Sequence, residues 1–170
     1  EIHGCQNKKE NAEKATHLLE HVGLTSGHFN QYPHELSGGQ LQRVGIARAI
    51  ALSPKLVVAD EPVSALDVSI QAQIINLLLD LKEKQDISYL FISHDMRVVE
   101  YFCDQVAVMY LGKIVELADS KQIYSSPQHP YTTALLNAIP SVESGRIKQK
   151  AFIKGGIPNQ TSAQRSCAFH

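Results

Sequence analysis

The sequence has few cysteines, no long apolar run and no signal-like start. Its cysteines, Cys5, Cys103 and Cys167, are odd in number, widely spaced and without a CxxC pair. That pattern argues against a disulfide framework and favours a reducing compartment. The longest apolar runs, such as residues 77–79, are too short to cross a bilayer. Any action at a membrane therefore requires docking onto an embedded partner.

Neither sign of charge is in excess, because 170 residues include 16 basic and 17 acidic side chains, for a formal net charge of −1. This balance argues against nucleic acid as a partner. A hydrophobic fraction of 44% is typical of a globular protein and argues against disorder of the whole chain. The sequence starts at Glu1 without a Met, and we expect it to begin inside the domain of a larger protein.

Apolar periodicity predicts two helices in the first third of the chain. The first covers residues 8–22 and ends at Gly23, since glycine is favoured just after a helix. A polar, turn-rich stretch follows from 25 to 35. The second helix begins after Ser37, its predicted N-cap, and ends before Pro54.

A buried parallel sheet is expected next. The pattern predicts a strand, a helix and a second strand at residues 55–59, 68–84 and 88–93. Asp60 and Glu61 follow the first strand, and His94 follows the second. This order predicts an α/β fold with a parallel βαβ core and helices on both faces.

The pattern weakens toward the C-terminus. A short helix, an antiparallel hairpin around Leu111 and Gly112, and two more short helices are expected at residues 96–103, 105–117, 119–124 and 131–138. From Pro140 onward, Ser, Gly, Lys and Gln dominate, and we expect a loosely ordered tail.

The acidic pair at the end of the first strand is a candidate catalytic site. Asp60 and Glu61 are adjacent, and alternation along a strand would direct their side chains differently. One could then hold Mg²⁺ while the other faces an attacking water, the division that phosphoryl transfer requires. Acidic pairs at strand ends are common, so the pair alone is weak evidence.

Ser37, Gly38 and Gly39 form a candidate phosphate seat at the start of the second helix. Free backbone N–H groups and the positive end of the helix dipole converge there, and glycine lets an anion approach closely. A flexible loop would be the simpler interpretation of a lone Gly-Gly pair.

Four motifs in sequence order resemble those of ABC ATPases. They are a signature loop (36–40), a Walker B strand with its carboxylates (56–61), a D-loop (64–67) and a switch histidine, His94. Five segments, some of which overlap these motifs, resemble the oligopeptide/dipeptide/nickel importer branch, at residues 32–40, 60–69, 91–95, 126–132 and 167–170. The resemblance covers most of the chain.

This resemblance implies the C-terminal part of a P-loop NTPase-like ABC nucleotide-binding domain. Residues 1–54 would be part of the helical signature subdomain and 55–118 part of the RecA-like core. Residues 119–170 would form the C-terminal extension of oligopeptide transporters.

The resemblance also implies roles for the motif residues, in a head-to-tail pair of domains that encloses ATP. Glu61 would polarise the attacking water, His94 would contact the γ-phosphate and Asp60 would hold Mg²⁺ through water. The signature residues would bind ATP held by the partner subunit, and the D-loop residues would lie at the dimer seam. These two sets are Ser37, Gly38, Gly39 and Gln40, and Ser64 and Asp67.

The partners implied are a second ABC ATPase subunit, identical or homologous, and transmembrane permease subunits. A peptide-binding protein would act indirectly. The chain would be peripheral, at the cytoplasmic face of the cytoplasmic membrane, and would use ATP and Mg²⁺ to energise peptide import.

The sequence departs from the family pattern in one respect. A GxxxxGK[ST] loop is absent, because the only Gly-Lys pair, Gly112-Lys113, is followed by Ile114. That loop, the adenine-stacking strand and the Q-loop would lie upstream of Glu1. We therefore expect this chain alone to be inactive.

Two other functions were weighed against the peptide-import ATPase. One is a truncated, non-catalytic remnant that only donates its signature loop in trans. The other is a soluble ABC ATPase of DNA repair or translation, which the neutral charge and the segment around His129 make improbable.

Several other residues suggest sites, but structural interpretations are favoured for them. His17 and His21 have a spacing that can bind zinc, although a polar helix face is the better interpretation. Cys167 and His170 offer too few ligands for a metal cluster, and Cys103 is expected in the core. Core packing and docking to a neighbour remain open for three residues: Tyr131, Leu135 and Leu136.

Overall fold

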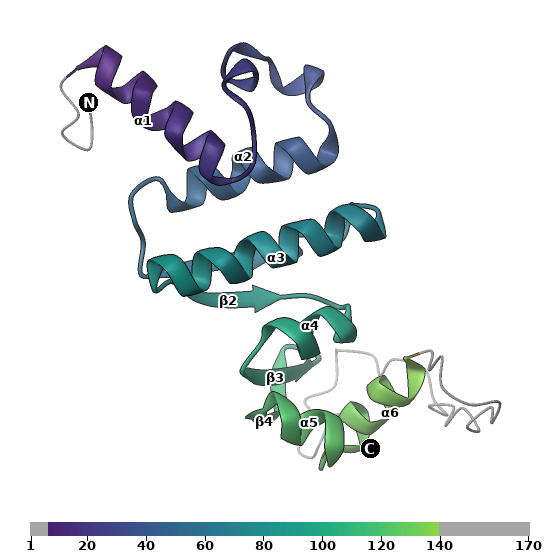
Figure 1. Ribbon diagram of the computed structural model, residues 1–170. Helices are drawn as coiled ribbons and strands as arrows, with labels where there is room; N and C mark the ends of the chain where they lie inside the picture. The colour runs from purple at the N-terminus through teal and green to yellow at the C-terminus, as the bar shows by residue number, and fades with distance from the viewer. Residues whose placement is uncertain (1–6, 140–170) are drawn as a thin grey trace. The chain divides into compact units, whose positions relative to one another are not determined.

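The computed structural model describes residues 7–139, which form two compact units divided between His94 and Asp95. Each unit is described separately. The first contains α1 (Lys8–His21), the 3-10 turns η1 (Ser26–Asn30) and η2 (Pro33–Glu35), α2 (Gly38–Ile50), β1 (Leu56–Asp60), α3 (Val68–Gln85) and β2 (Ser88–Ile92) (Figure 1). The second contains α4 (Met96–Phe102), β3 (Gln105–Tyr110), β4 (Lys113–Asp119), α5 (Ser120–Ser125) and α6 (Pro130–Ala138). The three-part division by role at residues 54 and 118 stays a prediction.

The helices of the first unit begin and end at the expected kinds of residue. The side chain of Asn7 caps α1 by accepting a hydrogen bond from the N–H of Lys9 at 3.1 Å. The chain then leaves α1 through Gly23 at φ +77°, as the sequence predicted. Arg43 of α2 donates to the carbonyl oxygen of Val22 at 2.6 Å and to Gln73 of α3 at 3.1 Å. One guanidinium therefore ties three helices together.

Apolar side chains from α2, α3, β1 and the connecting segments, including the one directly after α1, form the interior of this unit. The most buried are Val22, Leu24, Ile46, Ala47, Ile50, Ala59, Val63, Ile74, Ile75, Leu78, Leu81 and Ile87. Burial of these side chains is the main favourable term in holding α1, α2 and α3 together.

The strands β1 and β2 are parallel, and α3 connects them and lies alongside β2 (Figure 1). The register runs from Leu56↔Ser88 to Asp60↔Ile92, so both strands end at the same edge. The α/β class and the βαβ order are confirmed. Successive side chains alternate between faces, and one face is apolar and exposed: Leu56 57%, Val58 60%, Leu90 53% and Ile92 44%.

Over residues 95–139, the second unit consists of an antiparallel hairpin and three short helices. Leu111 and Gly112 both have positive φ, 46° and 77°, as a two-residue hairpin turn requires. A cluster of Val99, Val106, Val108 and Ile123 forms the core. Cys103 packs against this cluster, which confirms its expected core position. Tyr131 and Leu135 pack there too, which favours core packing over docking for both.

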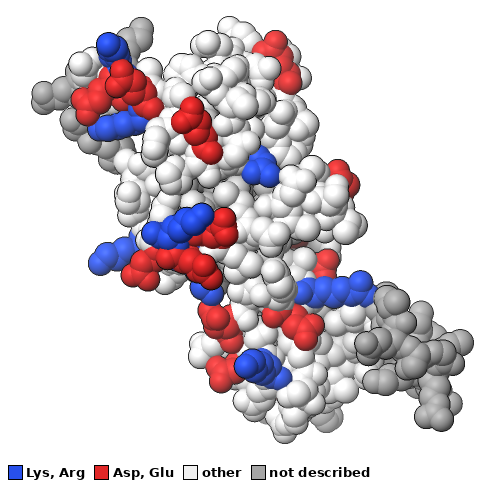
Figure 2. All heavy atoms as spheres, in the orientation of Figure 1, with Lys and Arg blue, Asp and Glu red and all other residues white. Residues whose placement is uncertain are grey.

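The expected tail from Pro140, and the residues Cys5, Cys167 and His170, lie outside the described residues. Within residues 7–139, no helix is both long and apolar enough to span a bilayer. Acidic and basic side chains are interspersed on the face shown in Figure 2.

Candidate functional site

The parallel pairing of β1 and β2 brings Glu61 and His94 together, 33 positions apart in sequence. Oε1 of Glu61 lies 2.7 Å from Nδ1 of His94. A carboxylate oxygen accepts, so Nδ1 is the protonated, donating nitrogen. The Glu61 side chain is 35% exposed and that of His94 is 78% exposed, so a ligand can reach both.

Glu61 has a backbone conformation that is rare for residues with a side chain. Its φ is +47°, in the left-handed region. The N–H of Glu61 donates to the carbonyl of Ile92 at 2.9 Å, and its own carbonyl accepts from the hydroxyl of Ser64 at 3.1 Å. Such conformations cost free energy and persist where surrounding contacts enforce them.

This turn corrects one step of the sequence analysis. Glu61 lies outside β1, which ends at Asp60, so strand alternation does not separate the two carboxylates. The left-handed turn redirects the chain immediately after Asp60 and aims Glu61 at His94. Asp60 is the last residue of β1 and is exposed.

The segment after Glu61 is held against α3 by a contact that sequence analysis missed. Nε2 of Gln71 donates to the carbonyl oxygen of Val63 at 2.9 Å, and Val63 itself is 3% exposed. The position of Gln71 four residues after the helix cap is a weak signal, because glutamine is common on helix surfaces.

This edge of the sheet offers few side chains that could bind a metal ion. Among residues 7–139 no group of three or more His, Cys, Asp or Glu side chains converges as a metal site. Mg²⁺ commonly takes one or two carboxylates and fills its other positions with water and phosphate oxygens. The exposed carboxylate of Asp60 fits that pattern, and a site for a metal that requires an all-protein cage does not.

The start of α2 confirms the predicted capping residue. Ser37 is the N-cap, and its Oγ accepts from the N–H of Gln40 at 3.3 Å. In return the N–H of Ser37 donates to Oε1 of Gln40 at 2.8 Å. This reciprocal arrangement is a capping box, and it fixes the backbone of the signature segment, residues 37–40.

The two glycines of that segment answer different requirements. A Cβ on Gly39 would lie 2.7 Å from Cγ2 of Ile70, which is closer than carbon atoms can approach. A Cβ on Gly38 would lie 3.4 Å from Leu66, a tight but possible contact. Gly39 is therefore required by the close approach of α2 to α3, a reason that the sequence analysis did not foresee.

Asp67 is the N-cap of α3. Its Oδ1 accepts from the N–H of Ile70 at 3.0 Å and from the hydroxyl of Ser69 at 2.7 Å. These hydrogen bonds, that of Ser69 first, hold the pKa of Asp67 below its usual value. The carboxylate therefore stays ionised and holds the segment of Leu66 next to the signature glycines.

The structure thus gathers the predicted site residues into two groups. Glu61, Ser64 and His94 form one group at the ends of the strands. The signature segment forms the other, and it contacts Leu66 and Ile70 on either side of Asp67.

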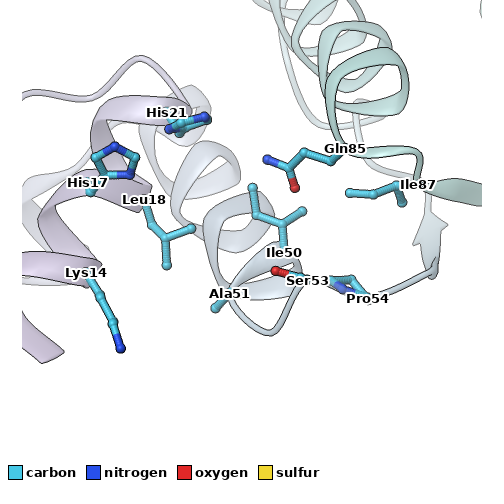
Figure 3. Close-up of a pocket in the computed structure, with 10 residues that line it drawn as sticks. All are labelled: Lys14, His17, Leu18, His21, Ile50, Ala51, Ser53, Pro54, Gln85 and Ile87. Atoms are coloured by element: carbon cyan, nitrogen blue, oxygen red, sulfur yellow. The ribbon is translucent and has the colours of Figure 1, made fainter. Parts of the chain in front are cut away.

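A separate pocket of about 550 Å³ lies between α1 and the C-terminal ends of α2 and α3 (Figure 3). None of the predicted site residues lines it. His17 and His21 point into this region from α1, with ring centroids 4.9 Å apart. No third metal-ligating side chain joins them within the described residues, so the polar-face interpretation is kept.

Known proteins match this chain over almost its whole length. The family described as ABC transporter matches residues 3–64, and the one described as oligopeptide/dipeptide transporter, C-terminal region, matches residues 115–170. A putative peptide import ATP-binding protein of Brucella ovis is 52% identical over 99% of the chain and 53% of that relative. The oligopeptide transport ATP-binding protein AppF of Bacillus subtilis is 49% identical over 99% of the chain and 52% of its own length.

Solved structures agree with the sequence matches. A dimeric ATP-binding cassette in a post-hydrolysis state, bound to ADP and Pi, matches with a TM-score of 0.61 and 31% identity. The match covers 69% of this chain and 50% of that one. The chain spans about half the length of the curated relatives it matches. By its sequence matches and its fold, the chain belongs to the family of ABC transporter ATP-binding proteins, in the oligopeptide/dipeptide branch.

Proposed function

We propose that this chain is part of an ATP-hydrolysing subunit that energises the import of oligopeptides or dipeptides. The observation that carries the proposal is the 2.7 Å contact between Glu61 and His94 at the end of the parallel strands. A carboxylate and an imidazole that share a hydrogen bond can together orient a water and sense a phosphate. The names of the relatives support peptide as the transported class.

Glu61 polarises the water that attacks the γ-phosphate, as an orienter or general base. The left-handed turn holds its carboxylate in place before ATP arrives, so little reorganisation is needed at the moment of reaction. His94 holds Glu61 through Nδ1 and contacts the γ-phosphate.

Asp60 is the residue that would hold Mg²⁺, through water. The bound ion would supply positive charge that offsets the charge on the phosphate oxygens. Asp60 is the last residue of β1, and Glu61 is the left-handed residue of the turn that follows. The two carboxylates therefore take separate tasks in this proposal.

The signature segment binds the γ-phosphate of ATP held by a second ATPase subunit. Ser37 is the N-cap of α2, and Gly38, Gly39 and Gln40 begin its first turn, where backbone N–H groups favour an anion. Ser64 and Asp67 lie on the connection from Glu61 to α3, and we assign them the coupling of the two sites at the dimer seam. The dimeric cassette among the structural neighbours supports a paired arrangement.

The remaining partners are transmembrane permease subunits, which the chain contacts at the cytoplasmic face of the membrane, and indirectly a peptide-binding protein. Nucleic acid is not among the proposed partners. The chain by itself is proposed to be inactive, because its sequence holds no GxxxxGK[ST] loop.

The proposed function is tested by replacing Glu61 with Gln in the native gene, so that the subunit is produced at its natural length. Uptake of radiolabelled di- and oligopeptides should fall by about 100-fold or more, because an amide cannot act as the base. Glu83→Gln, an exposed change on α3, is the matched control and should leave uptake unchanged. Normal uptake in the Glu61→Gln strain would contradict the proposal.

A further inference from the structure

The side chain of His28, in the segment between α1 and α2, contacts the signature segment. It lies in η1, 12 positions before Gln40, and its Nε2 is 3.1 Å from Nε2 of Gln40. Its Nδ1 lies 2.8 Å from the hydroxyl oxygen of Thr25 and 3.1 Å from the N–H nitrogen of Thr25. No motif singled out this histidine.

The orientation of the Gln40 amide follows from its other contact. The backbone N–H of Ser37 can only donate, so the atom of Gln40 that faces it at 2.8 Å must be the oxygen Oε1. The NH₂ group of Gln40 therefore faces His28. An amide NH₂ can only donate, so this contact is a hydrogen bond only when Nε2 of His28 accepts, with the ring proton on Nδ1.

A neutral imidazole has one donor and one acceptor nitrogen, so His28 cannot satisfy both of its neighbours' N–H groups at once. With the proton on Nδ1, the ring accepts from Gln40 and donates to the Thr25 hydroxyl. With the proton on Nε2, it accepts from the N–H of Thr25 but opposes the NH₂ of Gln40. Gln40 would then have to turn its amide over and release Ser37.

We propose that His28 is a positioning residue for the signature segment. With its proton on Nδ1, it holds the Gln40 amide in the orientation that caps the N–H of Ser37. The side chain of Gln40 thereby supports the backbone that receives the phosphate. The link to phosphate binding rests on the proposed function, but the hydrogen-bond arrangement does not.

The experiment measures this arrangement directly in the 170-residue chain at constant pH, without nucleotide. Long-range proton–nitrogen NMR spectra should show Nε2 of His28 as the unprotonated nitrogen. Amide hydrogen exchange at Ser37 should accelerate about two- to tenfold in His28→Leu, the range for loss of one hydrogen bond. His28→Gln, whose amide oxygen can accept from Gln40, should restore the protection.

His17→Leu, which removes an exposed histidine from α1, is the control and should leave exchange at Ser37 unchanged. Amides in the middle of α2 report whether each variant is folded. A ring proton on Nε2, or equal exchange at Ser37 in the wild-type chain and a folded His28→Leu variant, would overturn the proposal. Because no ATP is present, these results do not depend on whether the chain belongs to an active ATPase.

Discussion

The two units of this chain each contain a two-stranded sheet, but their polar side chains have different tasks. In the first unit, Glu61 and His94 at the strand ends bind each other and remain accessible. In the second unit, two side chains beside the sheet, Glu116 and Tyr124, bind backbone groups instead. Glu116 of β4 accepts from the N–H groups of Gln128 and His129 at 2.7 and 3.0 Å, and the hydroxyl of Tyr124 donates to the carbonyl of Met96.

The comparison separates side chains that are available to a ligand from those that hold the fold. A side chain whose partners are backbone groups stabilises local structure, and its removal affects folding. A pair of exposed side chains held by a strained turn gains little for stability, because surface ion pairs contribute about 0–1 kcal/mol. The geometry of Glu61 and His94 therefore fits the proposed catalytic role better than a role in stability.

The largest expected difference is in catalysis. In the natural-length subunit, His94→Ala should lower ATP turnover by about 100-fold or more, because the group proposed to contact the γ-phosphate is lost. Glu116→Gln in the second unit should leave turnover within about twofold of the wild type, since its partners are backbone groups. Phosphate release measures turnover, and similar losses in both variants would contradict the distinction between the two units.

The faces of the two sheets should also differ in their response to a buried hydroxyl. Val108 is 5% exposed and Val58 is 60% exposed. Val108→Thr should lower the free energy of unfolding by about 1–3 kcal/mol, because the new hydroxyl would be buried away from water. Val58→Thr should change it by less than about 0.5 kcal/mol. Urea unfolding measures both, and equal effects would indicate that the face of β1 is covered in solution.

Two glycines of α2, Gly39 and Gly45, should respond in opposite ways to alanine and so test the role of Gly39. Gly39→Ala should destabilise by about 1–3 kcal/mol, because its Cβ meets Ile70 at 2.7 Å. Gly45→Ala should stabilise by about 0.5–1 kcal/mol, since nothing lies within 4 Å and alanine favours the helix. The unfolding free energies of both variants, with Gly39→Ala/Ile70→Ala as a rescue, decide between a packing role and a purely phosphate-binding role for Gly39.

The smallest expected effect concerns acid stability, through one capping carboxylate in each unit. Burial raises the pKa of Glu116, but the hydrogen bonds from the N–H groups of Gln128 and His129 lower this pKa by a larger amount, so the net shift is downward. The pKa of Asp67 is lowered by Ser69 and Ile70.

A lowered pKa in the folded state means that the carboxylate stabilises the fold above its ordinary pKa of 3.8 for Asp or 4.5 for Glu. That contribution is lost as the pH falls through the lowered value. Asp67→Asn and Glu116→Gln should each flatten the dependence of unfolding free energy on pH below 4.5, and Glu116→Gln should cost about 0.3–1 kcal/mol at neutral pH. If the pH dependence of the unfolding free energy is unchanged in a variant, the replaced carboxylate does not contribute to acid stability.

Much of the fold could be predicted from sequence because local signals agree with the tertiary arrangement. Ser37 and Gly23 mark helix ends by capping chemistry, and Leu111-Gly112 marks a hairpin by its turn preference. The strand β1 extends one residue further than expected, to Asp60, because strand pairing with Ile92 overrides the polarity of the side chain.

By itself, the sequence determined the order of the elements, the motif residues and the family, since these depend on neighbouring residues and their types. The tertiary structure alone decided which side chains meet. The left-handed turn at Glu61, the contact of Gly39 with Ile70 and the hydrogen bond between His28 and Gln40 all join residues through packing of separate elements. No local pattern encodes such contacts, because their distances depend on how helices and strands lie against each other.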